Sequence, residues 1–223
     1  MEFLKRLISS PGGETREEQL DALVKQIHAE MKMAAGTFFV YDYKPTDSET
    51  YKALKSGPAA EQTALAQHIF THRNRLMVVK RTALREFGHH PAGVRLGFPI
   101  FRSLMRGALA LSSEEVLGWA QELAGEARGQ TAPGSFQLQF TSKHHIPLHE
   151  WPIALMVQTV ERNAKKVPLT PAVLEQLQAI LDWPEMRDTH GYYGTDFSKV
   201  ATRIKKLLGE AQGVDVKTLP YKK

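Results

Sequence analysis

The chain of 223 residues contains no cysteine. This absence excludes disulfide bonds, thiolate metal ligands and cysteine nucleophiles. A protein without disulfides suits a reducing compartment, so we expect a cytoplasmic location. The apolar fraction of 42% and the charged fraction of 24% are those of an ordinary globular protein.

Long apolar segments are also missing. The longest uninterrupted apolar run covers residues 153–157, whereas a helix needs about 20 apolar residues to cross a bilayer. No apolar signal-peptide centre is present in the first residues, MEFLKRLI, and early acids argue against a transit peptide. We therefore expect no membrane association.

Sequence motifs of common enzymes are absent as well. The chain has no phosphate-binding Gly-x-x-x-x-Gly-Lys, no Gly-x-Ser-x-Gly nucleophile elbow and no dinucleotide fingerprint. In the glycine-bearing loop at residues 188–196, His190 with Asp188 or Asp196 could form an acid–base pair. A turn in which Asp196 caps the next helix explains the same residues without chemistry. We therefore favour a protein that is not an enzyme, and we expect no cofactor.

Helical periodicity dominates what is present. Apolar residues recur at helical spacing over most of the chain, with start and stop signals between the segments. Ser112 with Glu115 fits a capping box, and Thr170 before Pro171 places proline in a first helical turn. The spacing predicts helices over residues 14–33, 58–87, 98–111, 113–125, 148–165, 171–181 and 196–211.

Two short segments depart from this helical pattern. Residues 37–43 concentrate strong β formers between Gly36 and Pro45. Residues 135–141 alternate apolar and polar side chains, which is the period of a half-buried strand. Since neither segment is stable as a lone strand, we expect at most a small two-stranded β element.

A short pattern occurs twice in the chain. In each copy a histidine pair precedes an aromatic-Pro-Ile triplet, which is Phe98-Pro99-Ile100 in the first copy and Trp151-Pro152-Ile153 in the second. A capped second helix follows each triplet. Such self-similarity is typical of stacked helical units. We therefore expect two copies of one helical hairpin at about residues 89–126 and 144–182.

The expected architecture is mainly α, with one helical domain over residues 1–223. Helices joined by short links pack antiparallel, so the hairpins would stack as a short solenoid-like array, loosely like HEAT-type solenoids, or form an irregular bundle. The last residues, about 214–223, are expected to form a mobile tail.

Acidic residues are scarce in the middle of the chain. Between Glu61 and Glu114 the only acid is Glu86, whereas residues 72–106, which we call the cationic window, hold eight lysines and arginines. The window has a formal charge of +7, and the rest of the chain sums to −2. Arginine suits forked contacts with phosphate or carboxylate. The pattern predicts a surface for an anionic partner made of Arg75, Arg81, Arg85, Arg95, Arg102 and Arg106.

Two cations of the window do not fit such a surface. On a continuous helix, Arg73 and Lys80 fall on the face that also carries apolar residues. Unpaired charges within a buried face are costly. A break of the helix near Asn74 is the simplest answer; a partly open face, or acids supplied from elsewhere, are the alternatives.

The leading functional hypothesis is a non-catalytic scaffold or adaptor that binds a protein or another anionic partner through these arginines. A solvated basic face, balanced by acids of neighbouring helices, explains the same charge without any partner. Nucleic acid is the alternative partner, although the window contains no recognisable RNA-binding motif and no convincing helix-turn-helix spacing.

A metal-dependent enzyme is the third hypothesis. His144, His145 and His149 stand beside Glu150 and form the densest group of potential ligands. Pro147 interrupts this group, and the His-Glu-x-x-His order of zinc-binding helices is absent. Histidine pairs before a helix also serve as loop residues bonded to the backbone, so we rank this hypothesis last.

Overall fold

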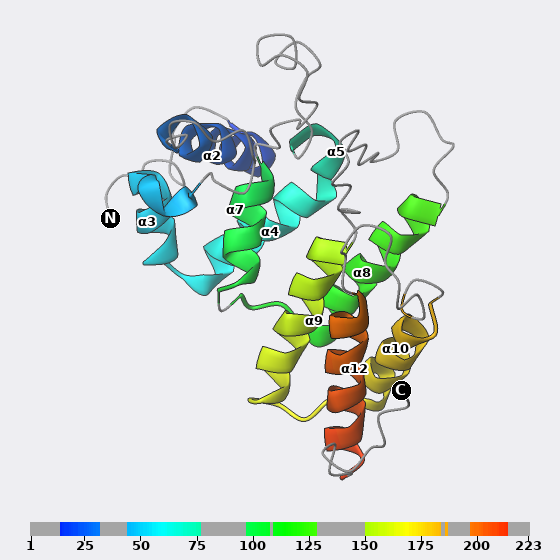
Figure 1. Cartoon of the computed structure of the whole chain (residues 1–223). Helices are drawn as coiled ribbons and strands as arrows, with labels where there is room; N and C mark the ends of the chain where they lie inside the picture. Colours follow the sequence, from blue (N-terminus) through cyan, green and yellow to red (C-terminus); the bar gives the residue numbers. More distant parts are fainter. Residues whose placement is uncertain are drawn as a thin grey trace. The chain divides into compact units, whose positions relative to one another are not determined.

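The computed structural model describes residues 14–31, 44–76, 97–107, 109–128, 150–183, 186 and 197–213. Most of these residues are helical, and none of them lies in a strand, which confirms the mainly α prediction for this part of the chain. The chain divides into two compact units, Met1–Ala110 and Leu111–Lys223 (Figure 1). None of the described helices is both long and apolar enough to cross a membrane.

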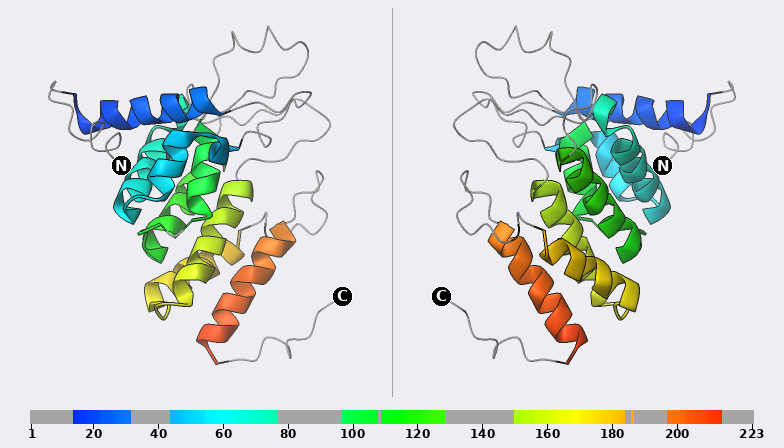
Figure 2. Two further views of the ribbon diagram at one scale, coloured as in Figure 1. Left: turned by 90° about the vertical axis from the view of Figure 1, so that its left-hand side faces the viewer. Right: turned by 90° about the vertical axis from the view of Figure 1, so that its right-hand side faces the viewer.

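In the first unit, helix α2 lies across α3, α4 and α7 (Figures 1 and 2). Helix α7 contacts α2, α4 and α5, and its Ile100, Leu104 and Met105 are completely buried. Each such side chain contributes about 1.5–3 kcal/mol of burial free energy. The elements are α2 (Arg16–Glu30), the 3₁₀ turn η2 (Pro45–Asp47), α3 (Glu49–Lys55), α4 (Ala59–Thr71), α5 (Arg73–Leu76) and α7 (Gly97–Met105).

In the second unit, four helices contact one another in a closed order. Helix α8 contacts α9, α9 contacts α12, α12 contacts α10, and α10 contacts α8. Their inner faces are apolar, with Leu117, Ile153, Leu177 and Ile204 completely buried. The elements are α8 (Ser113–Arg128), α9 (Glu150–Ala164), α10 (Pro171–Leu181) and α12 (Phe197–Ala211).

The capping residues act as the sequence predicts. The Glu115 backbone N–H donates to Ser112 Oγ at 3.1 Å, and the Ser112 N–H donates to Glu115 Oε2 at 2.9 Å, which completes a capping box. Thr170 Oγ1 accepts from the Val173 N–H at 3.3 Å, with Pro171 in the first turn. These bonds satisfy backbone donors that have no partner within their own helix.

The two aromatic-Pro-Ile triplets occupy the same register in their helices. Each triplet begins at the second residue of its helix, after Gly97 in α7 and after Glu150 in α9. Ile100 and Ile153 are both completely buried. The shared pattern therefore places one isoleucine in the core of each unit.

The hairpin prediction goes further than this local match. Helices α7 and α8 belong to different compact units, and α9 makes its most extensive contacts with α8 and α12. Equivalence of the full segments 89–126 and 144–182, and the single-domain arrangement, stay predictions. The expected strands at residues 37–43 and 135–141, and the expected tail at residues 214–223, lie outside the described residues.

The long helix predicted over residues 58–87 is wrong as a single element. Helix α4 ends at Thr71, and His72 follows it with backbone angles of −101° and 27° before α5 begins at Arg73. The break lies two residues before the predicted position at Asn74. Helix α3 was not predicted from the sequence, because it has only seven residues and no long apolar stripe.

Two glycines of α8 offer a direct test of this packing. An added Cβ at Gly118 or Gly125 would meet nothing within 4 Å. Because alanine favours a helix over glycine by about 1 kcal/mol, we expect Gly118→Ala and Gly125→Ala each to raise the free energy of unfolding by up to that amount. Urea denaturation followed by circular dichroism measures the change.

Gly97→Ala is the matched control for these two substitutions. A Cβ at Gly97 would stand 3.0 Å from the Leu76 carbonyl oxygen and 3.1 Å from Ile69 Cγ2. We expect this variant to be less stable than the wild type, because the backbone of α5 would have to move. Stabilisation at Gly97, or destabilisation at Gly118, would contradict the described packing.

Candidate functional site

The described residues include three of the six arginines assigned to the anionic surface. Arg75 lies on α5, Arg102 on α7, and Arg106 directly follows α7. Outside the described residues lie Arg81, Arg85, Arg95 and the histidine group His144, His145 and His149.

Arg73 is a buried cation, although the helix breaks at His72 just before it. Its exposed fraction is 6%, and its Nη1 donates to the Phe70 carbonyl oxygen at 2.8 Å. The guanidinium also lies 4.5 Å from the centre of the Phe70 ring, which is a cation–π contact. Arg73 therefore contributes to packing inside the first unit.

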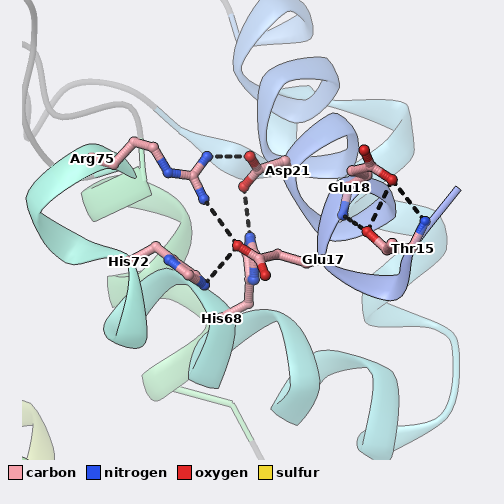
Figure 3. Close-up of polar contacts among 7 residues, drawn as sticks. All are labelled: Thr15, Glu17, Glu18, Asp21, His68, His72 and Arg75. Atoms are coloured by element: carbon pink, nitrogen blue, oxygen red, sulfur yellow. Dashed lines mark hydrogen bonds and ion pairs between the residues drawn. The ribbon is translucent and has the colours of Figure 1, made fainter.

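Arg75 belongs to a polar cluster that joins α2 to α4 and α5 (Figure 3). Its guanidinium donates to Asp21 Oδ2 and lies 3.8 Å from Glu17 Oε1. His68 Nε2 lies 2.7 Å from the other oxygen of Asp21, and His72 Nε2 lies 3.2 Å from Glu17 Oε1. We call these five residues the α2–α4 cluster.

Helical spacing explains how the α2–α4 cluster forms. Glu17 and Asp21 are four residues apart on α2, and His68 and His72 are four residues apart at the end of α4, so each pair shares one helix face. The two carboxylates thus oppose the two imidazoles, whose ring centres are 4.7 Å apart. The break at His72 turns the chain so that Arg75 reaches the same carboxylates.

The electrostatics of the cluster favour a structural role. Burial alone would raise the pKa of the Asp21 carboxyl, but hydrogen bonds from Arg75 and His68 outweigh it and hold the pKa below its ordinary value. Within the described ranges no group of three or more acids and histidines is arranged to hold a metal ion. The cluster neutralises the Arg75 charge and ties α5 to α2.

Another carboxylate of α2, that of Glu30, caps a neighbouring helix. Glu30 accepts hydrogen bonds from Ser48 Oγ at 2.7 Å, from the Thr50 N–H at 2.9 Å and from Thr50 Oγ1 at 2.6 Å. Gln26 donates to the same carboxylate at 3.2 Å. Because Ser48 is the N-cap of α3, Glu30 fixes the start of α3 against the end of α2.

The same bonds control the acidity of Glu30. Burial would raise the pKa of its carboxyl, but the bonds from Thr50, Ser48 and Gln26 outweigh this and lower the pKa from 4.5 to about 2. The carboxylate therefore stays charged, and its bonds stay in place, throughout the neutral and mildly acidic range.

A group of cations gathers where α7 ends. Arg106 is exposed, and Arg102 is half-buried one turn earlier on α7. The ammonium of Lys55, the last residue of α3, lies against the backbone of Gly107, since an added Cβ there would stand 2.3 Å from Lys55 Nζ. We call Lys55, Arg102 and Arg106 the α7-end cations. Lys55 was not among the predicted site residues, because it lies outside the cationic window.

In the described part of the second unit, polar bonds connect the helices. Arg203 of α12 donates to Glu161 of α9, and Asn163 donates to the Leu111 carbonyl oxygen at 3.0 Å. Thr170 Oγ1 donates to Glu114 Oε1 at 2.8 Å, which brings the first turns of α10 and α8 together.

The net positive charge of the chain is confined to the first unit. Residues 1–110 carry 16 lysines and arginines against 11 acids, whereas residues 111–223 carry 13 of each. Comparison with protein-family models, curated proteins and solved structures found no match to the chain.

The pairing of Arg75 predicts that the arginines differ in their effect on stability. Arg75→Ala would leave Asp21, whose side chain is 19% exposed, without its guanidinium partner, so we expect a cost of about 1 kcal/mol. Arg106→Ala should change the free energy of unfolding by no more than about 0.5 kcal/mol, as at other surface positions. Urea denaturation of both variants measures the difference. Equal costs would show that the α2–α4 cluster stabilises nothing.

Glu30 predicts a pH-dependent stability. The pKa of Glu30 in the folded protein is about 2, below its ordinary value of 4.5. Its contribution to the free energy of unfolding is therefore complete above pH 4.5 and is lost as the pH falls toward 2. The full shift corresponds to about 3 kcal/mol, and solvent screening of this partly exposed group reduces it to about 1–2 kcal/mol. Glu30→Gln should therefore cost that amount at neutral pH.

Urea denaturation of the wild type and Glu30→Gln, measured from neutral pH into the acid range, tests this contribution. The difference in the free energy of unfolding between the two proteins should decrease as the pH falls below about 4.5. Glu49→Gln is the matched control, since Glu49 is exposed on α3 and pairs only with Lys52 among the described residues. A gap independent of pH would contradict the role given to Glu30.

Proposed function

We propose that the protein is a non-catalytic helical scaffold or adaptor that binds an acidic partner protein through the cationic surface of its first unit. The observation that carries this proposal is the distribution of charge. The first unit holds the whole positive excess of the chain, and the cationic window alone contributes +7. A surface of this charge attracts acidic partners and accelerates their association.

The contacts indicate which cations serve this function. Arg73 is buried, and Arg75 is paired with Asp21 and Glu17, so both have structural partners. Arg106 is exposed and belongs to none of the ion pairs among the described residues. The binding charge in this proposal comes from Arg106, and from Arg81, Arg85 and Arg95 of the same window.

A helical framework suits a binding role. Stacked hairpins present long surfaces, and a scaffold of this kind needs no cofactor. A cysteine-free chain works in the reducing cytoplasm without loss of structure. Nucleic acid is the competing partner, and the following experiment separates the two.

The test is a titration of the whole protein with a fluorescent oligoglutamate peptide and, separately, with single-stranded and duplex oligonucleotides, over about 50–200 mM salt. A variant with Arg81→Gln, Arg85→Gln and Arg95→Gln removes three charges from the cationic window. A control with Lys199→Gln, Lys205→Gln and Lys206→Gln removes the same charge from α12 of the second unit.

We expect the peptide to bind, and the window variant to bind it more weakly than the α12 control. Tighter binding of oligonucleotides, with a steep dependence on salt, would favour nucleic acid as the partner. Binding of neither probe at the lowest salt concentration would overturn the proposal.

A further inference from the structure

We propose that Lys55 of α3 joins Arg106, with Arg102 beside them, to form the point at which an acidic segment of the partner protein docks. This inference rests on the proposed function and deepens it, because Lys55 lies outside the cationic window that the sequence singles out.

One hydrogen bond sets the position of Lys55. Tyr51, which is 1% exposed, donates from its hydroxyl to Ser103 Oγ at 2.6 Å and so fixes α3 against α7. Lys55 lies four residues after Tyr51, and Gly107 lies four residues after Ser103. Lys55 and Gly107 therefore each lie one helical turn beyond this hydrogen bond, and the Lys55 ammonium lies against Gly107.

The glycine at position 107 makes this approach possible. An added Cβ there would stand 2.3 Å from Lys55 Nζ and 3.1 Å from the Leu104 carbonyl oxygen. Any other residue would push the ammonium away from the end of α7. The small residue thus lets Lys55 lie next to the residue that follows Arg106.

Helix dipoles do not absorb all of this positive charge. The carboxyl ends of α3 and α7 meet near these cations, and each end carries about −0.5 elementary charge at most. Two helix ends therefore offset about one positive charge. Lys55 and Arg106 together carry two. A net positive charge remains at this point of the surface.

Acids of the first unit that form ion pairs are engaged elsewhere. Among the described residues, Glu61 pairs with Arg16, Glu49 with Lys52, and the carboxylates of the α2–α4 cluster with His68, His72 and Arg75. None of these ion pairs includes Lys55 or Arg106. Both exposed side chains are therefore available to carboxylates from outside the chain.

The chemistry of the site favours an acidic protein segment over nucleic acid. Proteins that bind single-stranded nucleic acid commonly present exposed aromatic rings on which its bases stack. In the described part of the first unit, Tyr51, Phe70 and Phe101 are at most 3% exposed. Neighbouring carboxylates of an acidic segment suit the arrangement: one can accept the forked guanidinium of Arg106, and another the ammonium of Lys55.

The experiment measures the affinity of the whole protein for the oligoglutamate peptide after single substitutions. Lys55→Ala and Arg106→Ala each remove one of the proposed contacts, and the double variant removes both. Lys25→Ala is the matched control, since Lys25 is exposed on α2 and its loss lowers the charge equally. Circular dichroism and the thermal midpoint of each variant verify that the fold is retained.

We expect Lys55→Ala and Arg106→Ala each to weaken peptide binding about twofold to fivefold, the double variant to weaken it further, and Lys25→Ala to leave it unchanged. If the wild type binds the peptide and Lys55→Ala binds it equally well, the docking point is wrong while the proposed function stands. Failure of the wild type to bind the peptide overturns both. Preference for an oligonucleotide, weakened by the same variants, overturns the choice of an acidic protein as the partner.

Discussion

The packing of the first unit depends on the hydrogen bonds and ion pairs that the carboxylates of α2 form with the neighbouring helices. Asp21 and Glu17 bind the histidines of α4 and Arg75 of α5, while Glu30 caps α3. A partly buried carboxylate is tolerated only when hydrogen bonds replace the water it loses, and each of these groups has such partners. One helix thereby determines where three others begin or turn.

This internal use of acids also decides where the positive charge remains. The carboxylates of α2 neutralise Arg75, and the Phe70 carbonyl and ring hold Arg73 inside the unit. Lys55 and Arg106 at the end of α7 belong to none of the ion pairs among the described residues, and the helix ends there offset only part of their charge. Exposed positive charge thus remains where internal pairing stops.

Much of the helical framework could be predicted from local patterns. Apolar periodicity located α2, α8, α9, α10 and α12 to within a few residues, and the capping residues Ser112 and Thr170 act as their spacing predicts. The predicted helix over residues 58–87 is interrupted at His72. The contacts that stabilise the turn there come from Asp21 and Glu17, about fifty residues earlier in the sequence. Helix α3 was missed for a related reason: its start is fixed by Glu30 of α2 as well as by its own cap.

The sequence by itself determined the helical class, the helix starts and the concentration of positive charge, because periodicity, capping and charge are properties of neighbouring residues. It could not decide which arginines are free to bind a partner. Arg75 and Arg106 look alike in the sequence, yet one is paired with Asp21 and the other is exposed. Only the tertiary structure brings Lys55 to the end of α7, since the bond between Tyr51 and Ser103 joins residues 52 positions apart. Contacts between residues so far apart in the sequence depend on how the helices pack, and the local sequence does not determine this packing.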